Sequence, residues 1–205
     1  MKNPKQEIII AAYQQFKQLG FKGVTMDDIA RATGVSKKTL YSLFADKDEL
    51  VLESVKYMLN ENQCMTDEAF KTSKNAVEEI IKILIIMEQM VRGMNLVCYQ
   101  DLQRYYPDAY KFLSHHKETY LFDCISKNLK AGIEQGLYRE DIDVDIISRF
   151  RMESALIVFQ NNLFPQEKYS MVKVNTQIFS HYMYGIATLK GHKLIQAHQN
   201  KINKI

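Results

Sequence analysis

The sequence predicts an all-α protein, with a small N-terminal domain of three helices followed by a larger helical domain. The chain has 205 residues, of which 46% are hydrophobic, so it can bury a substantial core and is too apolar for a disordered chain. It contains 8 Gly and 3 Pro, a scarcity that favours long helices over a turn-rich β protein. Apolar residues also recur at helical spacing in several long segments.

The first helix is predicted over residues 5–19. Gly20 follows the last apolar residue of the segment and is a common way to end a helix. This helix is expected to cover the next two with one apolar face, which consists of Ile9, Ala12, Tyr13, Phe16 and Leu19.

The second helix is predicted to begin after Thr25 and to end before Gly34. The Thr25 hydroxyl can cap the helix, and Asp27 and Asp28 place negative charge in its first turn, where the helix dipole favours it. A narrow apolar stripe faces inward and comprises Met26, Ile29 and Ala30.

The third helix is predicted to begin at a Ser36 cap, with Leu40 and Phe44 as its apolar face. Asp46 and Glu49 have the spacing of a capping box, so a fourth helix should follow directly and run toward residue 60. No flexible linker separates it from the third, and we expect rigid coupling. Two short helices joined by three or four residues form a helix-turn-helix.

In a helix-turn-helix, the first residues of the second helix meet base edges and phosphates in the major groove. Here those residues are Ser36, Lys37, Lys38 and Thr39, whose ammonium and hydroxyl groups suit phosphate oxygens and purine acceptors. The alternative is an ordinary helical hairpin whose lysines form a solvated face. Two further contacts to the DNA backbone are predicted, at Tyr41 and Lys47.

The segments FKGVTMDDIA, ATGVS, TLYSLF and DKDEL together resemble the DNA-binding domain of the TetR family of bacterial transcriptional regulators. The resemblance covers a quarter of the chain. It implies a phosphate contact for Thr25. It also implies the contacts predicted above for residues 36–39, Tyr41 and Lys47. Thr33 stands where the family commonly has Ala, and this difference is expected to change only local packing. Lys38 adds a long cation where the family frequently has Gly, so no base preference can be transferred. The resemblance further implies a homodimeric repressor that a small molecule releases from a palindromic site on double-stranded DNA.

The distribution of charge agrees with nucleic-acid binding. Residues 1–48 contain eight Lys or Arg and five Asp or Glu, whereas residues 49–205 contain nineteen of each. The net charge of +3 therefore lies entirely in the first segment. We accordingly predict a DNA-binding domain over 1–48 and a ligand-binding and dimerisation domain over 49–205.

Neither a disulfide framework nor a metal site is predicted from Cys64, Cys98 and Cys124, which form no CxxC pair and are expected to be buried thiols in a reducing cytosol. His115 and His116 point about 100° apart on a helix, unlike an i, i+4 metal-binding pair. No catalytic motif occurs, and neither an enzyme nor a cofactor is expected.

A cytoplasmic protein with no membrane association is expected. The N-terminus has no apolar signal region, and the strongest apolar run, residues 83–87, is far shorter than a membrane span.

Beyond the fourth helix, further helices are predicted over about 75–94, 96–105, 109–135, 145–163 and 171–189, with a break at Pro107. The last two have apolar faces broader than one small core requires, and the family resemblance implies that they pair with a second copy. Leu189 is part of the stripe on the last helix, and the alternative is that both faces are internal core. The interface residues proposed are Ile157, Ile178, Tyr182 and Ile186.

The middle helices carry adaptable and aromatic side chains that can line an effector pocket, although plain core packing is the simpler interpretation of each one. An arginine such as Arg92, Arg104 or Arg151 can anchor an anionic effector or form a surface ion pair. A helical ligand-binding or adaptor protein without specific DNA binding is the alternative function. The pocket residues proposed are Met87, Met90, Met94, Tyr99, Phe112 and Tyr120.

Overall fold

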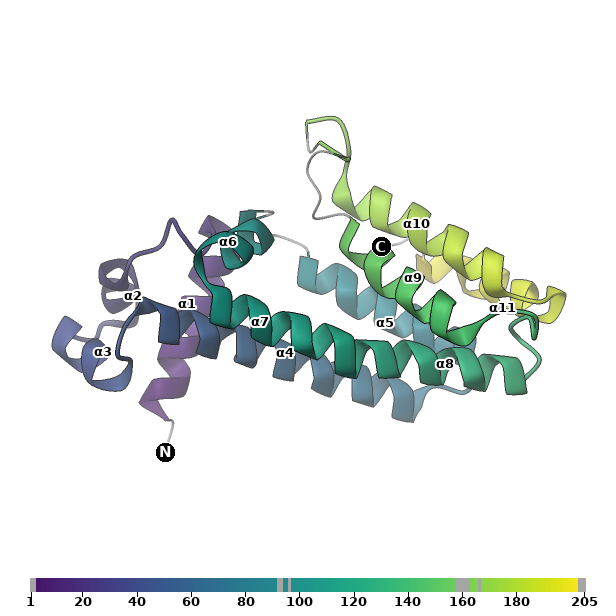
Figure 1. The fold of residues 1–205 in the computed structure, drawn as a ribbon, viewed down its shortest axis with the longest axis horizontal. Coiled ribbons are helices and arrows are strands. Elements are labelled where there is room, and N and C mark those ends of the chain that lie inside the picture. The colour runs from purple at the N-terminus through teal and green to yellow at the C-terminus, as the bar shows by residue number, and fades with distance from the viewer. Residues whose placement is uncertain (1–2, 92–93, 96, 158–162, 166, 203–205) are drawn as a thin grey trace. The chain divides into compact units, whose positions relative to one another are not determined.

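The computed structural model describes residues 3–91, 94–95, 97–157, 163–165 and 167–202. The chain forms two compact units (Figure 1). Unit 1 consists of residues 1–63 and 93–116, and unit 2 of residues 64–92 and 117–205. Every named element is a helix, as the sequence predicted.

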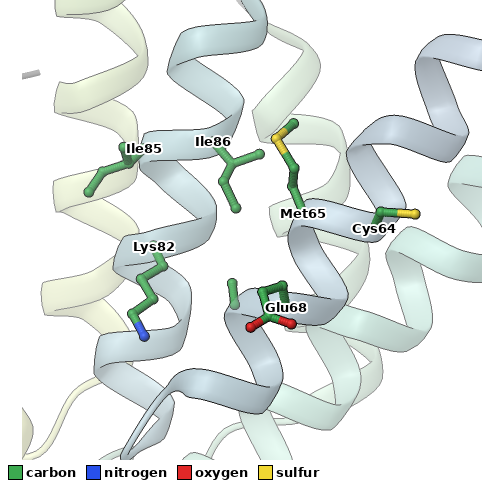
Figure 2. A pocket seen from close by; sticks show the side chains of 7 residues that line it. Cys64, Met65, Glu68, Lys82, Ile85 and Ile86 are labelled. Atoms are coloured by element: carbon green, nitrogen blue, oxygen red, sulfur yellow. The ribbon is translucent and has the colours of Figure 1, made fainter.

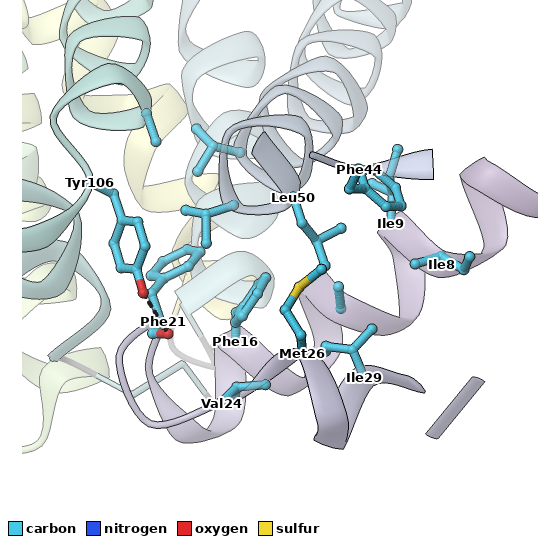
Figure 3. Packing of buried hydrophobic residues seen from close by; sticks show 14 of the residues in the cluster. Ile8, Ile9, Phe16, Phe21, Val24, Met26, Ile29, Phe44, Leu50 and Tyr106 are labelled. Atoms are coloured by element: carbon cyan, nitrogen blue, oxygen red, sulfur yellow. Dashed lines mark hydrogen bonds between the residues drawn. The ribbon is translucent and has the colours of Figure 1, made fainter. Parts of the chain in front are cut away.

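Unit 1 contains the predicted three-helix arrangement and two later helices. Its elements are α1 (Pro4–Leu19), α2 (Met26–Thr33), α3 (Lys37–Leu43), the first part of α4 (Lys47–Thr72), α6 (Val97–Tyr105) and α7 (Pro107–His116). Figure 3 shows Phe16, Met26 and Leu50 converging from three different helices. The core therefore fixes α2 and α3 against both α1 and α4.

The prediction for α1 was correct in its bounds and mostly correct in its face. Ile9, Ala12 and Phe16 are buried, and Ile8 joins them. Leu19, which we placed on the buried stripe, is 61% exposed. It is the last residue of the helix, and Gly20 turns the chain away immediately after it with a φ of 84°.

Helix α4 is longer than predicted, because it continues to Thr72 and not to about residue 60. No Gly or Pro occurs between Lys47 and Thr72, so nothing in the sequence stops the helix. The chain therefore passes from unit 1 to unit 2 within one unbroken helix.

Unit 2 begins within α4 and contains α5 (Ala76–Val91), a π-helical turn η1 (Lys117–Leu121), α8 (Phe122–Glu134), α9 (Val144–Leu156), α10 (Met171–Ile186) and α11 (Leu189–Ile202). The single helix predicted over 109–135 is thus three consecutive elements. It also begins at Pro107, because proline fits the first helical position, where no backbone donor is needed.

Two predictions for the C-terminal helices were wrong. Leu163 lies in a turn, not at the end of the helix that begins near residue 145, and residues 158–162 lie outside the described residues. The last predicted helix ends at Ile186, because Ala187 is extended with a ψ of 147°. Leu189 begins α11, which was not predicted, and is 81% exposed.

A buried polar network ties α5 to α8 and to the segment after α8. The Tyr138 hydroxyl lies 3.1 Å from the Ala76 carbonyl oxygen and 3.2 Å from Asn128 Oδ1. The amide of Asn128 in turn donates to Ala76 and to the Glu79 carboxylate. Burial raises the pKa of Glu79 above its usual value of 4.5, and the bond from Asn128 opposes this only in part.

Candidate nucleic-acid interface

The start of α2 is fixed by a reciprocal pair of residues. Thr25 Oγ1 accepts a hydrogen bond from the Asp28 backbone N–H at 3.2 Å, and the Thr25 backbone N–H donates to the Asp28 carboxylate at 3.0 Å. The Thr25 hydroxyl also donates to this carboxylate at 2.6 Å. These bonds hold the pKa of Asp28 below its usual value, the side-chain bond most strongly. Thr25 is therefore the predicted cap, and Asp28 completes a capping box.

The turn between α2 and α3 has the predicted geometry. Gly34 ends α2 in the left-handed conformation, with φ of 70° and ψ of 13°. Ser36 caps α3 by accepting the Thr39 backbone N–H at 3.1 Å, and the two hydroxyls lie 2.9 Å apart. Thr33 directs its hydroxyl back to the Ile29 carbonyl oxygen at 2.7 Å, which is the local packing role expected of it.

The two lysines at the start of α3 differ in their surroundings. Lys37 Nζ lies 2.6 Å from Asp27 Oδ2 on α2, and both side chains are exposed. Lys38 is exposed, and within the described part of the chain it forms no ion pair or hydrogen bond. A phosphate that approaches α3 thus meets a free ammonium at Lys38, but must compete with a carboxylate at Lys37.

Tyr41 lies one turn further along α3, and 52% of its surface is exposed. Its hydroxyl has no hydrogen-bond partner among the residues that the structure describes. The phenol is thus available to an external acceptor, as the predicted backbone contact requires.

Lys47 is at the first position of α4, as predicted, but its ammonium is engaged. Lys47 Nζ donates to the Lys22 carbonyl oxygen at 3.3 Å and lies 5.5 Å from the centre of the Tyr106 ring. Its partial burial lowers its pKa, and the nearby acids Asp101, Asp48 and Asp28 counteract this effect. The predicted contact with a DNA phosphate therefore requires that Lys47 leave these groups.

Sequence reasoning missed the contribution to this region of α6 and of Tyr106, which lies between α6 and α7. The Asp101 carboxylate accepts the Lys22 backbone N–H at 2.9 Å, and the Tyr106 hydroxyl donates to the Phe21 carbonyl oxygen at 3.2 Å (Figure 3). Both bonds hold the loop that precedes the Thr25 cap. They join residues about 80 positions apart, such as Lys22 and Asp101 with a separation of 79, so no local pattern could have indicated them.

The six proposed effector residues are divided between the two units. Met94, Tyr99 and Phe112 belong to unit 1, whereas Met87, Met90 and Tyr120 belong to unit 2. The Tyr120 hydroxyl donates to Asp67 Oδ1 at 2.7 Å. Tyr99 packs edge-on against Tyr110 with ring centres 5.9 Å apart.

A groove of about 510 Å³ opens in unit 2 between α4 and α5. Figure 2 shows Met65 of α4 opposite Ile86 of α5, with Glu68 and Lys82 at one end. The Lys82 ammonium is already bound to Thr72 and Glu78. None of the six proposed effector residues lines this groove.

The proposed interface residues also differ in exposure. Tyr182 and Ile186 are each 3% exposed and pack in the core of unit 2, which is the alternative that the sequence left open. Ile157 and Ile178 are partly buried. Helix α9 instead exposes two large apolar side chains one turn apart, Ile146 and Phe150.

The cysteines were predicted to be buried thiols, and one of them is not. Cys98 and Cys124 are buried as expected, but Cys64 is exposed and lines the groove described above. Within the described ranges, no three His, Cys, Asp or Glu side chains are grouped so as to hold a metal ion. Among the same residues, no helix has both the length and the apolar character to cross a membrane.

Residues 8–54 match the sequence pattern of a family described as "Bacterial regulatory proteins, tetR family". The uncharacterized HTH-type transcriptional regulator YvaF of Bacillus subtilis is 31% identical over 106 residues, which are 51% of this chain and 55% of YvaF. The chain thus matches about half the length of that relative. The HTH-type transcriptional repressor KstR2 of Mycobacterium tuberculosis is 26% identical over 153 residues, which are 70% of this chain and 74% of KstR2.

Solved structures share the fold over nearly the whole chain. The structure of KstR2 from Mycobacterium tuberculosis has a TM-score of 0.65 at 22% identity and covers 92% of this chain and 97% of KstR2. FadR of Bacillus subtilis, solved in complex with stearoyl-CoA, has a TM-score of 0.70 at 18% identity and covers 88% and 98%. The capped helix-turn-helix and the matched pattern show that residues 8–54 form a DNA-binding domain of the TetR family. Over the rest of its length, the chain is similar to transcriptional regulators of this family.

Proposed function

We propose that this protein is a homodimeric repressor that binds a palindromic operator and leaves it when a small molecule binds. The observation that carries the proposal is the start of α3, where Lys38 is exposed and without a charged partner in the described structure. The Ser36 cap places Lys38 in the first turn of α3, and the first turn of a recognition helix is the part that contacts bases.

The DNA contacts that we propose divide into two kinds. The first turn of α3 contacts base edges and the adjacent phosphates through Ser36, Lys37, Lys38 and Thr39. Thr25, Tyr41 and Lys47 contact phosphates and set the orientation of the unit on the duplex. To contact a phosphate, the Thr25 hydroxyl must redirect to it the proton that it now donates to the Asp28 carboxylate. Its oxygen can still accept the Asp28 backbone N–H, so the cap of α2 is kept.

The proposed dimer uses α9 and α10. Exposed Ile146 and Phe150 support a partner surface on α9, since large apolar side chains at helical spacing are favourable when covered. Partly buried Ile157 and Ile178 extend this surface, whereas the burial of Tyr182 and Ile186 gives them the role of supporting it from within. Two copies related by a two-fold axis would present their α3 helices to half-sites about 34 to 36 Å apart, or a multiple of that.

Release by an effector requires that the small molecule bind the released state more tightly than the DNA-bound state. The names of similar proteins support an effector, because FadR was solved with stearoyl-CoA and KstR2 is called a ketosteroid transcriptional regulator. The proposal includes no catalysis and no cofactor, since these relatives are named as regulators. It places the protein in the cytoplasm, where the operator is accessible.

The test is selection of bound duplexes from a random DNA pool by the purified protein, with Tyr41→Ala as the control. We expect a palindromic motif that the variant fails to enrich. Absence of enrichment with the wild-type protein would instead favour the alternative, a helical ligand-binding or adaptor protein without specific DNA binding.

A further inference from the structure

Three buried polar groups without partners gather on two contacting helices of unit 2. They are Arg151 Nη1 and Ser148 Oγ on α9 and Tyr182 Oη on α10, and none has a hydrogen-bond partner in the structure as described. Ser148 and Arg151 are three residues apart and so lie on one face of α9. Buried polar groups are normally paired, and a cluster of exceptions calls for an explanation.

Arg151 is the most unusual member of this cluster. Its side chain is buried, with 4% of the residue exposed, and its guanidinium carbon lies 5.3 Å from the centre of the Phe179 ring and 5.4 Å from that of Tyr182. In the described part of the chain no carboxylate forms an ion pair with it. Burial lowers its pKa, but arginine remains protonated in proteins.

Two aromatic faces offset only part of the cost of burying this charge. The ring quadrupole attracts a cation, but a ring face supplies no oxygen that accepts the guanidinium N–H groups. A bound water molecule would accept hydrogen bonds, but it would leave the positive charge uncompensated. An anion neutralises the charge and also accepts hydrogen bonds from Arg151 and from both hydroxyls.

The geometry of the donors indicates which anion. A guanidinium presents two parallel N–H groups that match the two oxygens of a carboxylate, and the Ser148 and Tyr182 hydroxyls can donate to the remaining lone pairs. Because Arg151 carries one positive charge, an anion with one negative charge neutralises it. The neighbouring Phe179 side chain is apolar and buried, so the rest of the ligand must be apolar as well.

We propose that Arg151, with the hydroxyls of Ser148 and Tyr182, binds the carboxylate of an amphipathic monocarboxylic acid. The inference rests on the proposed function, because it gives the chemical class of the effector. It assigns Arg151 to the bound anion and not to a surface ion pair, the other role that the sequence left open for this residue.

The first measurement is thermal unfolding of the ligand-free protein. Arg151→Met keeps the length of the side chain and removes the charge. Replacement of an uncompensated buried charge by an apolar group is neutral or stabilising. The variant should therefore unfold at the same temperature as the wild type or at a higher one. Arg149→Met is the matched control, since Arg149 is exposed and paired with Asp145 at 3.0 Å. A clear loss of stability in Arg151→Met alone would show that the fold already satisfies this charge, and would overturn the proposal.

The second measurement is binding of dodecanoate by titration calorimetry, with dodecan-1-ol as the uncharged probe. The wild type should bind dodecanoate and not dodecan-1-ol. Arg151→Met should weaken dodecanoate binding about 100-fold, as expected when one member of a buried charge pair is removed. Tyr182→Phe should weaken it about fivefold, the effect of one lost hydrogen bond. Arg151→Lys keeps the charge but lacks the two parallel N–H groups of the guanidinium, so it should also bind dodecanoate more weakly.

Three binding results would contradict the proposal: no dodecanoate binding by the wild type, equal binding of both probes, or unchanged binding in Arg151→Met. Weaker dimerisation of Arg151→Met would also contradict it, because a carboxylate of a second copy would then be the partner of Arg151. DNA binding separates this inference from the proposed function. If the wild type binds dodecanoate through Arg151 but selects no operator, the carboxylate site stands and the repressor function fails.

Discussion

Asp27 occupies the ammonium of Lys37, which we propose to contact DNA, and Asp27→Asn should therefore increase the DNA affinity. Asp27 Oδ2 lies 2.6 Å from Lys37 Nζ, and both side chains are largely exposed at 51% and 63%. An exposed pair of this kind contributes only about 0.2–1 kcal/mol to stability, so the variant should fold normally. In the wild type, a DNA phosphate must compete with this carboxylate for Lys37.

The magnitude follows from simple electrostatics. Removal of one negative charge about 4 Å from a phosphate is worth roughly 1 kcal/mol in water, or about fivefold in affinity for each copy of α3 that binds DNA. The two copies in the proposed dimer should together give about 25-fold. If Lys37 is freed to neutralise one further phosphate, the plot of log affinity against log salt should steepen by about 0.9 for each copy of α3.

The assay is fluorescence anisotropy with the selected operator between about 50 and 200 mM salt, a range in which phosphate contacts dominate the change in affinity. Asp145→Asn is the matched control, because Asp145 is also an exposed acid paired with an arginine but lies on α9. It should leave affinity and salt slope unchanged. The reasoning is refuted if Asp27→Asn leaves both quantities at their wild-type values, or if the control raises affinity equally.

Two further predictions concern the interface and the core. Lys38→Ala should weaken operator binding and relax base preference at one position in each half-site. Lys47→Ala should weaken the binding of all duplexes about equally, and the loss should be smaller because its ammonium already donates to the Lys22 carbonyl oxygen. Repeating the duplex selection with each variant checks this, and identical motifs from both variants would contradict it. Glu79→Gln should raise the melting temperature at pH 7.5 but not at pH 4.5. Because burial raises the folded pKa of Glu79 above its usual value of 4.5, the contribution of its protonated form is fully present below about pH 4.5 and is lost as the pH rises through the folded pKa. Gln keeps the acceptor that Asn128 needs and cannot ionise. Equal melting temperatures for the variant and the wild type at pH 7.5 would show that ionisation of Glu79 does not destabilise the fold at that pH.

Local signals in the sequence predicted the helix-turn-helix well. The caps at Thr25 and Ser36, the left-handed Gly34 and the start of α4 depend on residues within four positions of one another. Such contacts form whenever the backbone adopts the local conformation, so one sequence is sufficient to predict them.

Interactions between distant residues were not predictable in the same way. The Lys47 ammonium folds back to the Lys22 carbonyl, and Asp101 holds the backbone of Lys22, because α6 packs in the core of unit 1. Likewise, Tyr182 has the spacing of an interface residue, yet the chain covers it with its own helices. Periodicity shows that a face is buried but does not show which surface buries it.

The most direct test of the central claim is a photo-crosslink from α3 to DNA. A benzoylphenylalanine would replace Lys38 in the otherwise unchanged chain, and the same residue at Arg139, which is exposed and lies outside the proposed interface, would be the control. If α3 is the recognition helix, irradiation with the selected operator should crosslink position 38 to bases in the major groove of each half-site and leave position 139 unreacted. Crosslinks at position 139 but not at 38, or none at position 38 under conditions where the operator is bound, would contradict the assignment of α3 as the DNA-reading element.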